Sequence, residues 1–310
     1  MGRRNKVKLK RNDLFIGIYI LSAVLFFIIS IPSWLLDILL AFNIMVALVI
    51  LFNSLFAKEV LDMASFPTML LFTTIFRISL NVSSTKMILR DGYAGHVVSV
   101  FGQFVGGGNL VIGTIIFIVL IIVQFIVINK GSERVSEVTA RFTLDAMAGK
   151  QMAIDSDLNT GAITDKEAAE RRKKLQQENS FFGSMDGATK YVKGDATAGL
   201  IITAINLVGG IAMGMLYNGM SINDALSTYS ILTIGDGLCS QIPSLLISLS
   251  TGILVTKASS EGELGDEMVG QLFSMDRVLI MVGAALILLG VGTPLPFYIF
   301  VPLGVALIIY

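Results

Sequence analysis

The chain has 310 residues, of which 54% are hydrophobic and only 15% are charged, and its mean hydropathy is +0.77. Soluble domains carry about 25% charged residues, so this composition excludes an ordinary soluble protein and indicates an integral membrane protein. The net charge is zero, so no overall positive field favours nucleic acid. One cysteine and one histidine exclude an internal disulfide and a metal centre built from these residue types.

Eight apolar stretches follow one another along the chain, each close to the roughly 20 mostly apolar residues that a membrane-spanning helix needs. The sequence therefore predicts an all-α integral membrane protein with eight transmembrane helices. The predicted spans are residues 14–31, 35–56, a third that begins near 67 and runs into 77–89, 110–128, 196–217, 231–256, 278–291 and a last one from about 296 to 310.

Lysine and arginine residues give the expected orientation, because segments on the cytoplasmic side of a membrane carry an excess of them. With the N-terminus inside, every Lys and Arg except Arg77, Lys86 and Arg90 falls in an inside segment. We therefore expect both termini in the cytoplasm. The chain divides into a basic cytoplasmic tail at 1–13, four spans within 14–128, a polar cytoplasmic segment at 129–195 and four spans within 196–310.

The polar segment has helical signals of its own. Thr164 is followed three residues later by Glu167, a capping box that starts a helix, and apolar side chains further on give this helix something to pack against. We expect a small helical cytoplasmic insertion between the fourth and fifth transmembrane helices. A solvated helix without a partner is the alternative.

The third span contains all three exceptions to the charge rule. A spacing of about 100° per residue puts polar side chains on two opposite sides of this helix. A charge at the bilayer centre costs about 2.5–3.5 kcal/mol, so we expect protein or water around it and acids or carbonyl groups as partners. Lys86 and Arg90 could also reach the membrane interface. One side carries Arg77, Asn81, Ser84 and Thr85, and the other Ser79, Ser83, Lys86 and Arg90.

Three further acidic residues lie in or beside predicted spans. Asp236 begins a polar stripe on a helix that Pro243 should bend. The stripe could form a proton or water path that starts from the carboxylate. Alternatively, its small hydroxyl residues allow tight helix packing. Asp195 stands at the inner end of the fifth span, as a helix N-cap or a proton-exchanging acid, and Asp37 is placed to cap the second span. The stripe consists of Asp236, Ser240, Ser244, Ser248 and Thr251.

The chain lacks the motifs of catalysis and nucleotide binding. No GK[ST] follows the glycines of GQFVGGGN, so this is not a phosphate-binding loop, and the chain has no HExxH pair and no Ser-His-Asp set. The sequence therefore predicts a protein that is not an enzyme and has neither cofactor nor metal. Ion flow must then supply the energy for any work it does.

Four segments resemble the FHIPEP family of export-gate proteins, which is found in flagellar and injectisome type III secretion. RISLNVSSTKMIL (77–89) is similar to the signature of that family. SERVSEVTARFTLDAMAGKQMAIDSDLNTG (132–161), GSMDGATKYVKGDATAG (183–199) and TIGDGLCSQIPSL (233–245) extend the resemblance over essentially the whole chain. The segment AIDSDLNTG is more similar to the flagellar members of the family than to the injectisome members.

The resemblance implies a homo-oligomeric ring in the inner membrane, within the flagellar basal body, that couples the proton motive force to export of unfolded flagellar subunits. Its implied partners are further copies of itself, other export-gate membrane proteins, the export ATPase complex, the secreted subunits and protons, with sodium ions as an alternative and no nucleic acid. By residue match the resemblance implies energy coupling by Asp195, Asp236 and Lys190, a signature helix with Arg77, Asn81, Thr85 and Lys86, and charged cytoplasmic positions at Arg134, Arg141 and Asp145.

The sequence departs from the family pattern at two points. We expect a membrane domain without the large soluble domain that follows the eighth span in the family, and Ala148 stands where the family pattern has proline. The alternatives are an injectisome homologue, a structural ring that conducts no ions, and a solute transporter built from inverted repeats. Whether Arg77 pairs with Asp236 or with a neighbouring subunit stays open.

Overall fold

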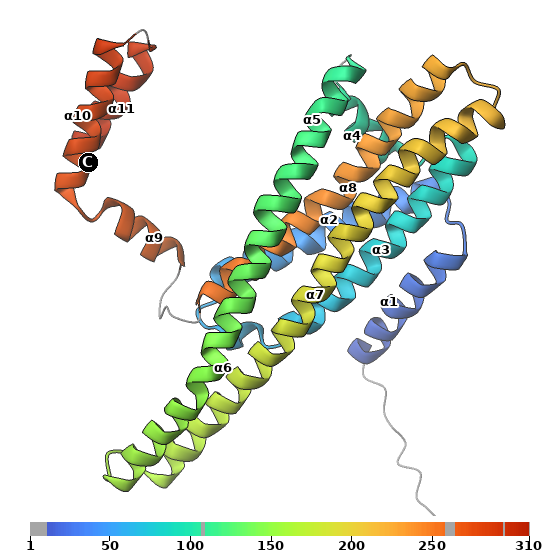
Figure 1. Cartoon of the computed structure of the whole chain (residues 1–310). Coiled ribbons are helices and arrows are strands. Elements are labelled where there is room, and N and C mark those ends of the chain that lie inside the picture. Colours follow the sequence, from blue (N-terminus) through green and yellow to red (C-terminus); the bar gives the residue numbers. More distant parts are fainter. Residues whose placement is uncertain (1–10, 107–108, 258–263, 294, 310) are drawn as a thin grey trace, which may run out of the picture. The chain divides into compact units, whose positions relative to one another are not determined.

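The computed structural model describes residues 11–106, 109–257, 264–293 and 295–309, and the regular structure in these residues is entirely helical (Figure 1). Contacts divide the chain into two units, residues 1–259 and 260–310. Most of the predicted basic tail at 1–13 lies outside the described residues. The first unit contains α1 (Arg11–Ile28), α2 (Ser33–Phe56), the 3₁₀ helix η1 (Val60–Met63), α3 (Phe66–Asp91), α4 (His96–Gly106), α5 (Leu110–Val123), the π-helical segment η2 (Gln124–Asn129), α6 (Lys130–Asn159), α7 (Asp165–Leu216) and α8 (Ile222–Thr256).

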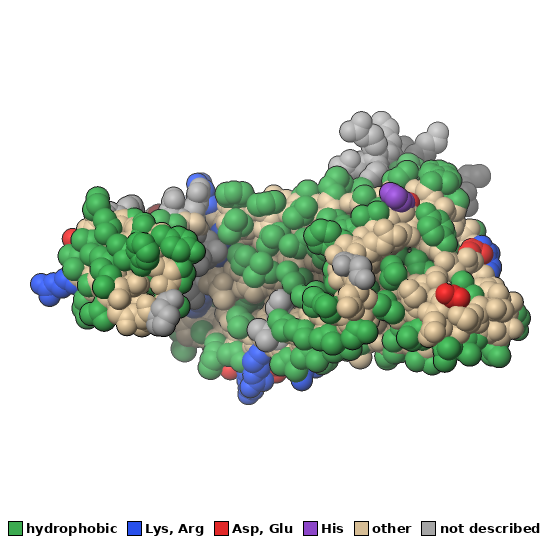
Figure 2. Space-filling model, turned by 90° about the horizontal axis from the view of Figure 1, so that it is seen from above, with side chains coloured by type: hydrophobic (Ala, Val, Ile, Leu, Met, Phe, Trp, Pro, Cys, Tyr) green, Lys and Arg blue, Asp and Glu red, His purple; other side chains and the backbone are tan. Residues whose placement is uncertain are grey.

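Five helical stretches are long and apolar enough to cross a membrane: α2, η1 with α3, α5 through α6, α7, and α8. α1, α4 and α11 (Phe297–Ile309) contain shorter apolar helices. Hydrophobic side chains cover much of the face seen in Figure 2, and even a side chain as large as that of Phe104 is 84% exposed. Such a surface suits lipid rather than water. The prediction of an all-helical membrane protein is confirmed, whereas the count of eight spans stays a prediction.

The polar segment at 129–195 consists of two helices that continue into apolar ones. α6 follows α5 through η2, and α7 runs on for 52 residues to Leu216. α6 and the first part of α7 pack together and form what we call the charged hairpin (residues 130–195; Figure 1). The capping box that starts α7 is confirmed: the Thr164 N–H donates to the Glu167 carboxylate at 2.8 Å and the Glu167 N–H donates to the Thr164 hydroxyl at 3.3 Å. The first of these bonds lowers the pKa of Glu167.

α3 is packed between other helices rather than facing lipid along its length. It contacts α1, α2, α7 and α8, and Figure 1 shows it lying beside α7. Its apolar residues Phe76 and Leu80 pack in a core with Leu36 of α2 and with Tyr229 and Leu232 of α8. The polar residues of α3 are therefore held inside the bundle by apolar neighbours on the same helix.

α4 lies between the third and fourth predicted spans, where the sequence pattern indicated no helix. Its first turn is capped by Asp37, whose carboxylate accepts hydrogen bonds at 2.9 Å from the backbone N–H groups of His96 and Val97. The prediction that Asp37 caps the second span was therefore wrong, since α2 begins after Pro32 without a side-chain cap. α4 packs so closely on α8 that a Cβ atom on Gly235 would clash with the Val98 carbonyl group.

The second unit contains α9 (Leu264–Phe273), α10 (Asp276–Gly292) and α11. α10 and α11 coincide with the last two predicted spans and pack against each other as a hairpin. The helices approach closely at two small residues, because a Cβ atom on Gly283 would clash with the backbone of Gly304 and the reverse is also true. Such small-residue contacts are typical of helices that associate within a membrane.

Candidate functional site

Arg77 and Asp195 form a buried ion pair between α3 and α7. The Arg77 Nη2 group donates to Asp195 Oδ2, and the side chains are 1% and 4% exposed. Arg77 lies 11 residues into α3, or about 16 Å from its start at 1.5 Å per residue, so the pair is deep in the bundle. The partner of Arg77 within this chain is therefore Asp195, and not Asp236.

Asp195 occupies the interior of α7. The N-cap of this helix is Thr164, far upstream, so the interpretation of Asp195 as an N-cap was wrong. The two lysines that precede Asp195 point to other acids. Lys190 pairs with Asp186 at 3.2 Å and Lys193 pairs with Glu133 at 2.9 Å.

Asp236 is the second buried acid of the site, and it lies on α8. Its Oδ2 atom accepts a hydrogen bond from Asn206 Nδ2 of α7 at 2.8 Å. The hydroxyl of Ser84, on α3, is within hydrogen-bonding reach of the same carboxylate. Asp236 is 4% exposed. Both buried acids thus face polar groups from α3 and α7, and α8 completes the site.

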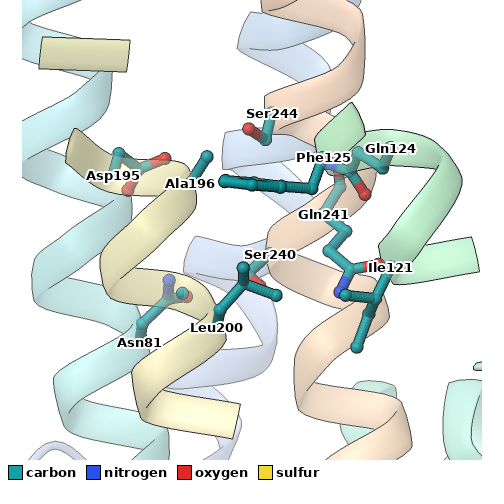
Figure 3. A pocket seen from close by; sticks show the side chains of 11 residues that line it. Asn81, Ile121, Gln124, Phe125, Asp195, Ala196, Leu200, Ser240, Gln241 and Ser244 are labelled. Atoms are coloured by element: carbon teal, nitrogen blue, oxygen red, sulfur yellow. The ribbon is translucent and has the colours of Figure 1, made fainter. Parts of the chain in front are cut away.

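A small cavity of about 30 Å³ lies beside Asp195 (Figure 3). Side chains from α3, α7, α8 and the junction of α5 with η2 converge on it, and many of them are polar. Ser240 and Ser244, two members of the predicted hydroxyl stripe, line its α8 side. We call it the inner cavity; its polar lining consists of Asn81, Gln124, Asp195, Ser240, Gln241 and Ser244.

A second small cavity, of about 20 Å³, follows along α7 and α8 toward the charged hairpin. It is lined by polar side chains of α6, α7 and α8, including the third stripe serine, Ser248. Ser248 lies one helical turn beyond Ser244, so the two cavities succeed each other along the same face of α8. We call this one the outer cavity; its lining is Ser132, Glu133, Thr189, Val192, Lys193, Ser248 and Thr251.

Several buried polar atoms at this site have no hydrogen-bond partner among the described residues. Buried polar groups are nearly always hydrogen-bonded, and those with no protein partner are where proteins bind internal water. The site is therefore able to hold water next to both acids. The atoms are Arg77 Nε and Nη1, Thr85 Oγ1, Asp195 Oδ1, Asn206 Oδ1 and Ser244 Oγ.

The opposite polar side of α3 contacts α1. Lys86 donates to the backbone carbonyls of Phe27 and Ile28, the latter at 3.5 Å, and the Ser83 hydroxyl donates to the Phe26 carbonyl at 2.9 Å. These carbonyls belong to the last turn of α1, where the helix dipole favours a cation. Both polar sides of α3 therefore face protein groups, as expected, whereas Arg90 is exposed and pairs with its neighbour Asp91.

The remaining predicted residues lie away from the two cavities. Arg134, Arg141 and Asp145 are exposed on α6, where Arg134 pairs with Glu137 at 3.2 Å. Lys190 is 72% exposed on α7. Within the described parts of the chain, no three His, Cys, Asp or Glu side chains gather as a metal site.

One buried cation went unnoticed in the sequence. Lys257, at the end of α8, is 2% exposed and donates to the backbone carbonyls of Leu55 and Ala57, the former at 2.7 Å. It caps the end of α2 as Lys86 caps the end of α1. Its place among the charged connections suggested solvent exposure, and no local signal distinguishes it from an exposed lysine.

Comparison with known proteins places this arrangement in context. The sequence model of the FHIPEP family matches residues 23–310. The chain is 53% identical over 292 residues to the flagellar biosynthesis protein FlhA of Bacillus subtilis (strain 168), with 94% of this chain and 43% of that protein covered. It is 49% identical over 296 residues to FlhA of Salmonella typhimurium, again with 94% and 43% covered.

A relative with a different name matches the chain as well. The chain is 46% identical over 296 residues to protein MxiA of Shigella flexneri, with 95% of this chain and 43% of that protein covered. The chain therefore spans less than half the length of the curated relatives it matches. No solved structure matches the chain.

Proposed function

Because this chain belongs to the FHIPEP family, we propose that it is the membrane part of a flagellar type III export-gate subunit. In this proposal the subunit couples the proton motive force to the export of unfolded flagellar subunits. The flagellar assignment is supported by two proteins named flagellar biosynthesis protein FlhA, to which about half of the aligned residues are identical.

The proposed setting is the inner membrane within the flagellar basal body. We take the eight spans from the eight apolar stretches of the sequence. The positions of Lys and Arg put both termini and the charged hairpin on the cytoplasmic side. The proposed partners are further copies of the chain in a ring, other export-gate membrane proteins, the export ATPase complex and the exported subunits.

The ion-coupling part of the proposal rests on the row of polar groups between Asp236 and the charged hairpin. Asp236, the inner cavity with Asp195, and the outer cavity with Glu133 follow one another along α7 and α8. Ionisable groups within a membrane protein usually mark ion pathways. Water at the unpartnered polar atoms would join the two acids into one path for protons.

The Arg77–Asp195 ion pair would couple proton movement along this path to a movement of helices. While Asp195 is ionised, it compensates the charge of Arg77 and holds α3 against α7. A proton on Asp195 would leave Arg77 buried without a counter-charge, and breaking a buried pair costs about 3–5 kcal/mol. The pair would then separate or admit water, so that α3 shifts relative to α7. Since α7 continues into the charged hairpin, this shift would reach the cytoplasmic side.

The proposal is tested by neutralising the two acids in the full-length protein. Asp195→Asn and Asp236→Asn should each abolish export of flagellar subunits in cells, while the protein still inserts and accumulates in the membrane. Asp224→Asn is the matched control, because Asp224 is exposed at the start of α8 and pairs only with its capping partner Ser221. Normal export from both acid variants would favour a structural ring that conducts no ions.

An injectisome export gate is the second candidate function. The observation in its favour is the 46% identity to MxiA, which covers as much of this chain as the flagellar relatives do. Deleting the full-length gene from its own organism separates the two. Loss of flagella indicates the flagellar function, and loss of injectisome secretion with flagella intact indicates the other.

A further inference from the structure

The outer cavity has one ion pair at its mouth. Lys193 Nζ of α7 lies 2.9 Å from Glu133 Oε1 of α6, and both side chains line the cavity. Lys193 is 59% exposed and Glu133 is 27% exposed, while Ser248 and Thr251 at the α8 side of the cavity are buried. The pair therefore stands between solvent and the polar interior of the bundle.

The inner cavity lies directly behind this pair. Ala196 of the inner cavity follows Val192 of the outer cavity by one turn on α7, and Ser244 precedes Ser248 by one turn on α8. A water molecule or ion that moves from solvent to Asp195 along the α7–α8 interface therefore passes Glu133 and Lys193 before it reaches the inner cavity. Among the described residues, the other ion pair at these cavities is Arg77–Asp195, which contributes Asp195 to the lining of the inner cavity.

α6 meets α8 at the same place, whereas further along it is held to α7 by packing and by additional ion pairs. The Ser132 hydroxyl donates to the Ser248 carbonyl at 2.6 Å, and the next attachment up the chain is Gln124 Nε2, which donates to the Gln241 carbonyl at 3.0 Å. Between these two bonds the helix passes through the π-helical segment η2. Short π-helical segments interrupt the regular hydrogen-bond ladder and are frequent at functional sites. A movement of the start of α6 relative to α7 would therefore begin at η2.

We propose that the Glu133–Lys193 ion pair is a gate that closes the hairpin-side entrance of the two polar cavities. The proposal rests on the ion path proposed above, and it adds two residues that neither the signature nor the hydroxyl stripe contains. When the pair is formed, α6 covers the cavities; when it separates, water and ions reach Ser244 and Asp195 from the side of the charged hairpin.

The gate is tested by thiol labelling, which needs no ion flux. Cys239 and any other cysteine of the full-length protein are replaced by serine, and Ser244→Cys is introduced as a reporter in the inner cavity. Inside-out membrane vesicles are treated with a membrane-impermeant methanethiosulfonate reagent. Glu133→Gln and Lys193→Met should each speed labelling of the reporter by about two- to fivefold, as expected for losing one partly exposed ion pair.

Glu137→Gln is the matched control. It makes the same change one turn along α6 and removes the exposed pair with Arg134, but it lines neither cavity. It should leave the labelling rate unchanged. The exchanged pair, Glu133→Lys with Lys193→Glu, should restore slow labelling, and it carries the test if a single variant does not fold.

The outcomes separate the gate from the ion path. Equal labelling rates in Glu133→Gln and Glu137→Gln, or fast labelling in the exchanged pair, would overturn the gate. If the gate variants label faster but the protein transports no ions, the gate stands and the proposed ion path is wrong. If ions are transported and labelling does not respond, the path stands without this gate.

Discussion

At the scale of single residues, Arg77 and Asp195 depend on each other. Both are buried, and Arg77 Nε and Nη1 and Asp195 Oδ1 have no further partner among the described residues. A buried pair of this kind contributes little net stability, but removing one partner leaves an uncompensated charge in an apolar setting. A change of charge on either residue would therefore act on the fold through the other.

This dependence predicts the behaviour of single and double variants. Asp195→Leu should destabilise the folded protein by about 3–5 kcal/mol, because Arg77 stays buried and charged. The double variant Arg77→Met with Asp195→Leu should recover most of that loss, because both charges are gone, and yet export should stay abolished. Thermal unfolding in detergent measures the stability of the single and the double variant. A double variant less stable than Asp195→Leu would show that the two residues do not act as a pair.

The sequence could predict the surroundings of Arg77 but not its partner. The helical positions of residues 77–90 place polar side chains on two opposite sides, and this local pattern is enough to exclude lipid. Asp195 lies 118 positions further on, and its pairing depends on how α3 and α7 pack. Local patterns contain no information on such a contact, and the expected membrane boundary near Asp195 suggested a helix cap instead.

At the scale of helices, α3 is packed between α1 on one side and α7 on the other. The polar part of its contact with α1 consists of Ser83 and Lys86, which donate to carbonyls of the last α1 turn, and the Tyr19 ring of α1 also stacks on Phe76. A cation at a helix C-terminus is worth about 0.3–1 kcal/mol, and more when it is partly buried. The signature helix thus positions two neighbours with two different kinds of polar contact.

Lys86→Met should therefore loosen the end of α1. Amide hydrogen exchange of the last α1 turn should become faster, because the carbonyls lose their charged donor and the docking surface weakens. Arg90→Met is the control: Arg90 is one turn further on α3, but it is exposed and pairs only with Asp91. Equal exchange in the two variants would show that Lys86 reaches the membrane interface instead of holding α1.

The length of α7 is the main difference between the predicted and the observed elements. Its first part has the composition of a solvated helix and its last part that of a membrane span, so the change of composition near 195 suggested a boundary. Composition reports the surroundings of a helix and not its continuity. In the structure the helix continues through the change, and this continuity connects the buried ion pair to the charged hairpin.

At the scale of the whole first unit, the two cavities and the two buried acids form a row with a large or charged side chain at each end. Toward the hairpin stands the Glu133–Lys193 pair. At the other end, beyond Asp236, the fully buried ring of Tyr229 fills a groove at Gly210 and Gly214 of α7. In the proposed ion path, the side chains at both ends would have to move before an ion could pass.

Proton flux tests the central claim most directly. The full-length protein is reconstituted into vesicles that contain a pH-sensitive dye, and a potassium gradient with valinomycin sets the membrane potential. The account predicts a proton flux above that of empty vesicles, which falls to background in Asp236→Asn and is retained in the control Asp224→Asn. An equal flux in Asp236→Asn and the unchanged protein would contradict it.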